Sequence, residues 1–297
     1  MAEDLFIGVD GGASHVRARI RDGTGRCLGE GAAGPANVWV DLDGATRNIT
    51  EACRAAAAAA GLSERDLGRI HAGLGLAGAV TEAQRALVRA RPFPFATLVV
   101  DNDAYAACLG AHNGKDGAIL IVGTGSCGLA VVAGRRVNVG GWGTVVSDDG
   151  SGGSLGREAL RRCLWALEGL APHTALSREL AAEFGDDPAR IAEWAKHAAP
   201  ADFARFAPRI FARARERDPL AMALIRDAAA ILALMVERLL ACGAPAVCLV
   251  GGMADAVAPW LPPPLRDRLA PPAADAVDGA ILMARQARAV ATVAPPP

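Results

Sequence analysis

The pattern of hydrophobic and polar positions in the first third of the chain predicts an α/β arrangement. Apolar runs bounded by Gly, Asp or Pro are typical of short strands, and alanine-rich stretches are typical of helices. Three strands joined by turns come first, and helices then alternate with two buried strands. The expected strands are Leu5–Asp10, Val16–Arg21, Cys27–Ala32, Ile70–Leu76 and Thr97–Val100, and the expected helices are Ile49–Ala60 and those starting near Thr81 and Asn102.

The same order of elements then returns. Three more short strands precede a long helical region, one further buried strand and a final helix. These are Ala118–Val122, Gly128–Ala133, Arg135–Val139, the helical region from Leu155 to about Ala241, the strand Val247–Val250 and the helix Ala276–Ala289. The repeated order predicts two α/β lobes, residues 1–113 and 114–290, with 291–297 as a frayed tail. The last helix can also pack back on the first lobe.

Composition favours a globular protein without a polyanionic partner. Apolar residues make up 52% of the 297 residues, so a substantial core is expected. The net charge is −1, from 31 basic and 32 acidic side chains, with no basic block. We therefore expect neither nucleic acid nor an anionic membrane as a partner.

Cysteine use and the N-terminus predict a soluble, cytoplasmic protein. None of the seven cysteines forms a C-x-x-C pair, which favours reduced, mostly buried thiols over a zinc or iron–sulfur site. The acidic N-terminus leads straight into a strand, unlike a signal peptide. The longest uncharged apolar run, Ala228–Val236, is too short to span a bilayer.

The first strand and turn carry the first sign of chemistry. Asp10 ends a buried strand, and Gly11, Gly12, Ala13 and Ser14 turn the chain directly into the next strand. Backbone amides in such a turn can approach phosphate oxygens, the Ser14 hydroxyl can add a donor, and Asp10 can hold Mg²⁺. The same residues also suit an ordinary hairpin turn.

Six segments in order then resemble a known family. They are DGGAS at 10–14, DNDA at 101–104, GTGS at 123–126, GGWG at 140–143, DDGSG at 148–152 and LVGGM at 249–253. Together they resemble the sugar kinases of the actin/hexokinase/Hsp70 superfamily, and most closely the N-acetylglucosamine and glucosamine kinase branch of the BadF/BadG/BcrA/BcrD ATPase family. The resemblance runs from Phe6 to about Arg285. It implies a two-lobed, ribonuclease H-like, actin-like ATPase fold with a nucleotide cleft between the lobes.

The resemblance also implies an activity: transfer of the ATP γ-phosphoryl group to the C6 hydroxyl of N-acetylglucosamine or glucosamine. The expected cofactors are ATP and Mg²⁺, with Asp10 as the metal ligand. The ATP-binding residues implied are Gly11, Gly12, Ser14, Gly123, Thr124, Gly125, Gly251 and Gly252. By themselves, residues 123–126 could be a plain hairpin turn and Gly251-Gly252 a structural turn.

Asp103 is the expected general base. It follows the strand Thr97–Val100 at the start of a helix, so its carboxylate can point into a cleft and accept a proton from a sugar hydroxyl. The alternative is that it caps the helix. Asp101 or Asn102 could fill that cap instead and leave Asp103 for substrate.

The family pattern places the sugar against two loops. The residues implied are Asn37, Trp39, Asp103, Gly141, Trp142, Gly143 and Asp148. Indole rings suit the apolar face of a hexose and polar side chains suit its hydroxyls, although a lone Trp is more often a core residue. The chain departs from the pattern at Ala13, His15 and Asp149, and it lacks a serine in 73–78 that contacts the acetamido group in some relatives. Free glucosamine therefore stays open as the substrate.

Two other functions fit the wider pattern. One is an ATP-driven activator of a dehydratase or reductase, with Cys127 and Cys163 as conceivable iron–sulfur ligands. The other is a sugar-sensing regulator, which would be expected to carry a DNA-binding helix-turn-helix. A homodimer is possible, because homodimers are common among soluble enzymes.

Overall fold

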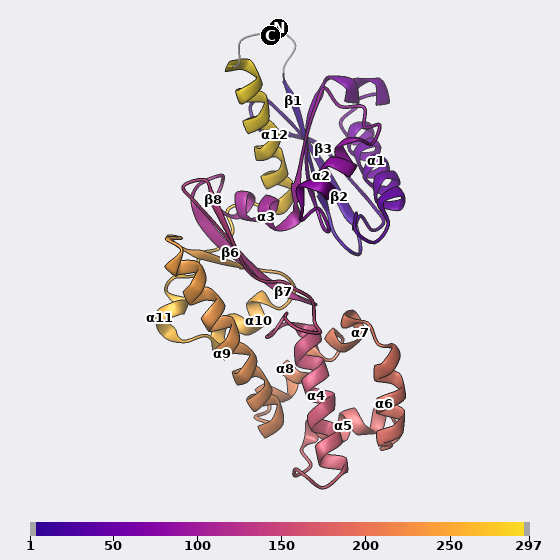
Figure 1. Ribbon diagram of the computed structural model, residues 1–297, viewed down its shortest axis with the longest axis vertical. Helices are drawn as coiled ribbons and strands as arrows, with labels where there is room; N and C mark the ends of the chain where they lie inside the picture. The colour runs from indigo at the N-terminus through magenta and orange to yellow at the C-terminus, as the bar shows by residue number, and fades with distance from the viewer. Residues whose placement is uncertain (1–3, 294–297) are drawn as a thin grey trace. The chain divides into compact units, whose positions relative to one another are not determined.

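The computed structural model describes residues 4–293 and divides the chain into two compact units. The first contains the chain up to Asp116 and the segment from Pro272 onward, and the second is Gly117–Pro271 (Figure 1). The boundary predicted after residue 113 falls in the same connection. The second lobe was predicted to extend to residue 290 and so to include the last helix. In the structure this helix packs on the first unit, which is the alternative that the sequence left open.

The first unit is a five-stranded sheet in the order β3-β2-β1-β4-β5. β1, β2 and β3 are antiparallel, whereas β1, β4 and β5 are parallel. The strands are β1 (Leu5–Gly11), β2 (Val16–Asp22), β3 (Cys27–Ala33), β4 (Ile70–Leu76) and β5 (Thr97–Asn102); the helices are α1 (Leu42–Ala59), η1 (Glu64–Arg69), α2 (Glu82–Arg89), α3 (Asp103–Ala111) and α12 (Ala276–Val293).

The two faces of this sheet carry different side chains, which follows from the alternation along β2 (Val16–Asp22). Its apolar residues Val16, Ala18 and Ile20 are buried toward α1, whereas its arginines face α12. Figure 1 shows α1 and α12 on opposite sides of the sheet.

The predicted tail 291–297 lies partly outside the described residues, and 291–293 belong to α12.

Ion pairs and glycines hold α12 against the sheet. Arg19 lies 3.0 Å from Asp275 and 2.9 Å from Asp278, and Arg21 lies 2.7 Å from Asp278. Burial by itself would raise the pKa of Asp278, but the hydrogen bonds and positive charges of Arg21 and Arg19 together outweigh burial and lower this pKa. Glycines beneath the helix let its backbone approach the strands directly. The closest approaches to the strands are at Gly8 and Gly73, and Gly110 of α3 and Gly279 of α12 let those two helices pack equally closely.

The second unit is a four-stranded sheet, ordered β8-β7-β6-β9, with a helical layer. β6 and β9 are parallel, and the other pairs are antiparallel. The strands are β6 (Gly117–Val122), β7 (Ser126–Val132), β8 (Arg135–Gly140) and β9 (Val247–Val250); the helices are α4 (Gly152–Leu167), α5 (Ala175–Glu183), α6 (Pro188–His197), α7 (Pro200–Ala204), α8 (Ala207–Arg215), α9 (Pro219–Ala241), α10 (Ala254–Val257), η2 (Ala258–Trp260) and α11 (Pro263–Arg266).

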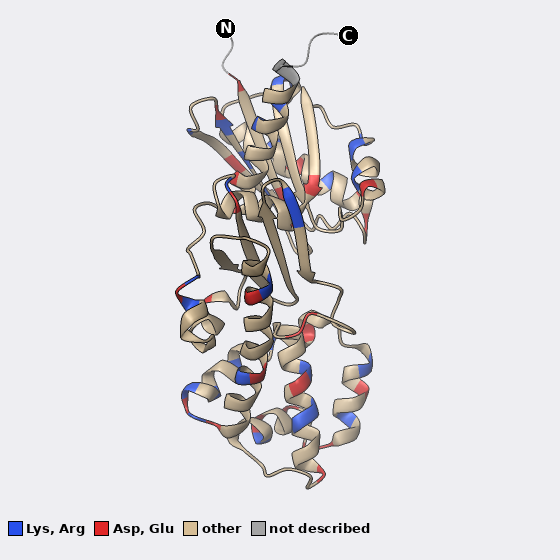
Figure 2. Cartoon of the chain, turned by 60° about the vertical axis from the view of Figure 1, so that its left-hand side comes forward, with Lys and Arg blue, Asp and Glu red and all other residues tan. Residues whose placement is uncertain are grey.

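The core of this unit lies between the sheet and α4, α5, α8 and α9. Within residues 4–293, α9 is the single helix that is long and apolar enough to cross a membrane by length and composition. Half of its most apolar window is buried inside the unit. Lys/Arg and Asp/Glu side chains are interspersed along both units (Figure 2).

Candidate active site

The predicted first phosphate loop is the tight turn between β1 and β2. The Gly12 amide donates a hydrogen bond to the His15 carbonyl at 3.0 Å, which closes the hairpin and uses that amide. The amides of Ala13 and Ser14 make no hydrogen bond within residues 4–293. The Ser14 hydroxyl lies 3.0 Å from Nδ1 of His15. The turn therefore offers two amides and a hydroxyl to an anion, and Gly12 supplies room rather than a donor.

Asp10 makes an ion pair that was not predicted from the sequence. It pairs with Arg17 in the β1–β2 register, and the guanidinium lies 2.7 Å from the carboxylate. The signal was present in the sequence, because residues that flank a hairpin turn symmetrically face each other across the strands. Arg17 thus supplies a positive charge beside this turn.

Asp103 lies at the junction of β5 and α3, and the N-cap position of α3 is filled by another residue. The Asn102 side chain caps α3 by accepting a hydrogen bond from the Tyr105 amide at 2.7 Å. Asp103 is the first residue of the helix, and its carboxylate accepts a bond from the adjacent Ala104 amide at 2.9 Å. Of the two readings open in the sequence, capping thus belongs to Asn102.

The parallel strands bring Asp10 and Asp103 to the same edge of the sheet. Asp10 is in register with Gly75 on β4, and Gly75 with Asp101 on β5. Asp103 follows two residues later, at the carboxyl ends of the strands where α/β proteins bind ligands. Burial, reinforced by the negative charge of Asp10, raises the pKa of Asp103 above its usual value of 3.8. Such a carboxylate accepts a proton more readily than an ordinary one.

Asn37 and Trp39 lie on a loop beside the same turn. Asn37 Oδ1 accepts bonds from the amides of Trp39 at 3.0 Å and Val40 at 3.3 Å, so only its Nδ2 stays free to meet a ligand. Trp39 is 73% exposed and therefore is not a core residue. A cavity of about 420 Å³ is lined by Asn37 and by Ala13 of the first turn. The cavity joins the predicted phosphate and sugar segments of this unit.

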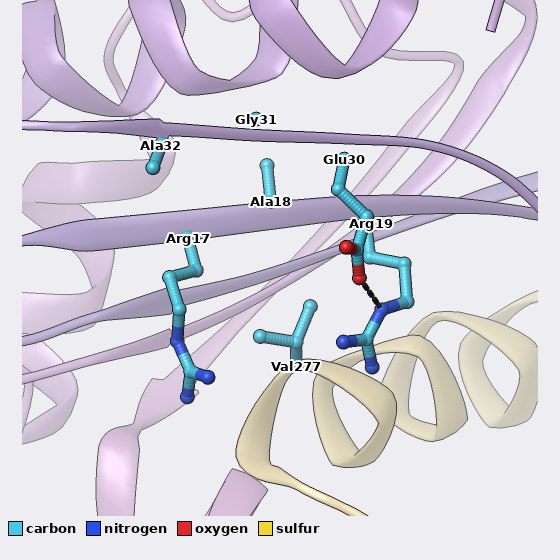
Figure 3. A pocket seen from close by; sticks show the side chains of 7 residues that line it. All are labelled: Arg17, Ala18, Arg19, Glu30, Gly31, Ala32 and Val277. Carbon is cyan, nitrogen blue, oxygen red and sulfur yellow. Dashed lines mark hydrogen bonds and ion pairs between the residues drawn. The ribbon is translucent and has the colours of Figure 1, made fainter. Parts of the chain in front are cut away.

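A second hollow of the first unit, about 350 Å³, is a different place. It lies between β2, β3 and α12, and its lining includes Arg17, Arg19, Glu30 and Val277 (Figure 3). It contains none of the residues predicted for the site. Arg17 alone links it to Asp10.

In the second unit, the predicted phosphate turn 123–126 connects β6 to β7. The Gly123 amide closes the turn onto the Gly125 carbonyl at 2.9 Å. The Gly123 and Thr124 carbonyls accept bonds from the amides of Gly152 and Gly153 at 2.8 and 3.0 Å, which fixes the turn to the start of α4. Within the described chain, the amides of Thr124 and Gly125 make no hydrogen bond and are available to an anion.

Asp148 packs directly on this turn. Its backbone has a φ of 60°, and a Cβ built on Gly125 would lie 2.7 Å from its carboxylate oxygen. Gly125 therefore has to be a glycine for Asp148 to lie here. Burial raises the pKa of Asp148, while bonds from the Gly143 and Ser126 amides partly oppose that shift.

The predicted adenosine turn lies at the end of β9 against β6. Gly251 has a φ of 102°, and a Cβ there would lie 2.6 Å from the Val122 carbonyl oxygen. The Met253 amide donates to that same oxygen at 3.0 Å. No atom lies within 4 Å of a Cβ built on Gly252, so its face is open. Val122 precedes the phosphate turn, and the two turns are therefore neighbours.

The loop after β8 presents the second tryptophan. Gly141 and Gly143 have φ values of 79° and 92°, so both need glycine, and Trp142 between them is 74% exposed. An indole that is exposed between two glycine turns suits contact with a ligand better than a place in the core. The predicted residues Asp10, Gly11, Gly12, Ser14, Asn37, Trp39 and Asp103 thus lie in the first unit, and the remaining predicted residues lie in the second.

A family comparison explains this set of features. The model of the BadF/BadG/BcrA/BcrD ATPase family matches residues 7–267, most of the chain. The chain belongs to this family. Membership implies that the chain uses ATP.

Individual relatives agree with this assignment. Glucosamine kinase GspK of Vibrio cholerae is 39% identical over 95% of this chain and 96% of its own length. The crystal structure of a predicted N-acetylglucosamine kinase from Chromobacterium violaceum is 33% identical, with a TM-score of 0.87 over 95% of this chain and 99% of that one. A ROK family glucokinase from Streptomyces griseus, in complex with glucose and AMPPNP, shares the fold at 22% identity and a TM-score of 0.55, over 95% and 99% of the two chains. The predicted α/β, actin-like fold class is confirmed.

Cys163, one of the two cysteines considered for an iron–sulfur cluster, does not suit this role. Cys163 is fully buried, and its thiol donates a hydrogen bond to the Ser177 carbonyl at 3.3 Å. Burial raises its pKa to about 11, which disfavours the thiolate that a cluster requires. Within residues 4–293, no group of three or more His, Cys, Asp or Glu side chains could hold a metal ion.

Proposed function

We propose that the protein transfers the γ-phosphoryl group of ATP to the C6 hydroxyl of glucosamine or N-acetylglucosamine, in the cytoplasm. The observation that carries this proposal is the placement of Asp103 beside Asp10 at the carboxyl edge of a sheet, free of a capping role. The 39% identity to a glucosamine kinase over almost the whole chain supports the amino sugar as acceptor.

In this mechanism Asp103 accepts the proton of the attacking hydroxyl and orients that oxygen toward the phosphorus. The exposed indoles of Trp39 and Trp142 pack on the sugar ring, and Nδ2 of Asn37 and the carboxylate of Asp148 bond to its hydroxyls. The free amides of the two turns, at Ala13, Ser14, Thr124 and Gly125, bind phosphate oxygens.

Asp10 is the residue that would hold Mg²⁺. One carboxylate beside a phosphate-binding turn fits this ion, because Mg²⁺ is usually bound by one or two carboxylates together with substrate phosphates and waters. The ion would neutralise charge on the phosphates. Arg17, now paired with Asp10, keeps that carboxylate oriented beside the turn.

The direct test is an assay of ADP release with a panel of acceptors: glucosamine, N-acetylglucosamine, N-acetylmannosamine, N-acetylmuramic acid and glucose. We expect kcat/KM to be highest for glucosamine or N-acetylglucosamine. Phosphorus NMR of the product should show a phosphomonoester at C6. A protein that releases ADP with none of the amino sugars would contradict the proposal.

The raised pKa of Asp103 predicts how activity depends on pH. The base must be ionised, and a proton stays on this carboxylate to a higher pH than on an ordinary aspartate. We expect kcat/KM to fall as the pH drops, with a midpoint above the usual carboxyl value of about 4. Product formation measured by NMR between about pH 4 and pH 8 checks this without coupling enzymes. A rate that stays constant down to about pH 4 would exclude this role for Asp103.

A further inference from the structure

The outer face of α9 is apolar at its centre and charged at both ends. Ile231 is 38% exposed and Leu234 is 65% exposed, and the adjacent Ala230 is also exposed. The exposed Arg226 and Asp227 lie toward the helix N-terminus, and the exposed Glu237 and Arg238 toward its C-terminus. These seven residues, which we call the α9 face, lie on one side of the helix, because they recur at spacings of three and four.

The four charges of the α9 face have no partner in their own chain. None of them makes a side-chain hydrogen bond or ion pair within residues 4–293. The neighbouring helices behave differently: Glu158 of α4 pairs with Arg161 and Arg162. Glu179 and Glu183 of α5 likewise bind arginines of α8. The four charged side chains of the α9 face are therefore available to pair with charges of another molecule.

The order of these charges suits a second copy of the same helix. Two helices related by a two-fold axis pack antiparallel when the axis is perpendicular to both, and residue i then meets residue j while j meets i. Centring the contact between Ile231 and Leu234 sets Ile231 against the partner's Leu234, and Asp227 against the partner's Arg238. On the flank, Arg226 comes close to the partner's Glu237. Every charge therefore meets its opposite, whereas a parallel pair would set like charges together.

The surface beside the α9 face also leaves room for such a contact. A hollow of about 260 Å³ lies between α4 and α9, lined in part by Asp227 and Ile231. In the antiparallel arrangement, the partner's Leu234 lies next to Ile231 and can enter this hollow. The apolar centre would then be shielded from water.

From these observations we infer that the α9 face is a homodimer interface, formed by antiparallel packing of α9 on α9 of a second copy. One pair of helices buries less area than the roughly 1,200 Å² of typical stable complexes, so the dimer should be weak and depend on protein concentration. The inference does not depend on the proposed function.

Sedimentation velocity of the full-length protein over a range of concentrations tests the interface. We expect the wild type to form a dimer, and Leu234→Glu to raise the dimer dissociation constant by about tenfold or more, because each interface then buries two unpaired carboxylates. Leu170→Glu is the matched control, since Leu170 is 72% exposed elsewhere in the same unit, and it should leave the dimer intact. Circular dichroism and the thermal unfolding midpoint check that each variant is folded.

Charge reversal gives a second test that does not depend on the apolar centre. Arg226→Glu and Glu237→Arg should each weaken the dimer, and the double variant should restore it, because the pair is only exchanged. A monomeric wild type at all concentrations would overturn the inference, as would a dimer that survives Leu234→Glu. Leu234-dependent binding of a monomer to phospholipid vesicles would assign the face to a membrane and equally overturn it.

Discussion

Replacing Asp103 with asparagine should lower kcat by about 10²–10⁴-fold and leave the dissociation constant for ATP nearly unchanged. Asparagine keeps the size of the side chain but cannot take the proton of the sugar hydroxyl. The loss should therefore appear in the chemical step and not in nucleotide binding. Single-turnover kinetics and calorimetric titration of an ATP analogue measure the two quantities separately.

The control for this experiment is Asp267→Asn. Asp267 is an exposed carboxylate at the end of α11 and has no place in the predicted site. Its replacement should leave kcat within about twofold of the wild type. Equal activity of Asp103→Asn and the wild type would remove Asp103 from the mechanism and would leave the family assignment untouched.

The second large effect concerns stability. A Cβ on Gly73 would lie 1.9 Å from the Ala280 carbonyl oxygen and 2.9 Å from its carbon, both in the backbone of α12. Backbone cannot swing aside as a flexible side chain does, so Gly73→Ala must push α12 away from β4. We expect the free energy of unfolding to fall by about 3 kcal/mol or more. Urea denaturation followed by circular dichroism measures it.

Gly68→Ala is the matched substitution without a clash. The nearest atom to a Cβ at Gly68 is the Pro94 carbonyl oxygen, at 3.7 Å, which is an ordinary contact. The free energy of unfolding of this variant should lie within about 0.5 kcal/mol of the wild-type value. If both alanine variants were equally stable, α12 would not be packed as closely on the sheet as described here.

Strands were easier to predict than helix boundaries. Leu5–Asp10 and Val16–Arg21 differ from β1 and β2 by one residue at an end, because the apolar pattern and the glycine turn agree there. The helix predicted at Ile49–Ala60 starts at Leu42 instead, because Asp41 caps it by accepting the Gly44 amide at 2.8 Å. That cap lies outside the alanine-rich stretch on which the prediction rested.

The helical region 155–241 was predicted as one stretch, whereas the structure has six helices there, α4 to α9. Residues that start or end helices were present in the sequence. Pro188, Pro200 and Pro219 each occupy the first turn of a new helix, and Gly169 and Gly185 adopt positive φ after helix ends. High helix propensity across the region concealed these breaks.

For the residues of the candidate site, too, one part could be predicted from the sequence and another could not. Their positions on turns and strand ends followed from the sequence, because Gly and Asp at the end of an apolar run have few structural alternatives. The hydrogen-bond and ion-pair partners of their polar atoms could not be predicted in the same way. The Gly12 amide is used within its own hairpin and Asn37 Oδ1 within its own loop, and the ion pair of Arg17 with Asp10 was not predicted although the hairpin spacing indicates it. Hydrogen-bond partners depend on distances that residue types alone do not fix.

The docking of α12 has a consequence for biosynthesis. The sheet surface at Gly8 and Gly73 is covered by residues 276–293, which are synthesised after all the other helices and strands of the two units. The Gly117–Pro271 unit has all its residues synthesised before that segment emerges, and it can become compact first. Until then, the glycine-containing face of the sheet in the amino-terminal unit stays uncovered. A chain that stops before α12 should therefore be a substrate for chaperones and proteases, even though it contains every residue assigned here to sugar and nucleotide.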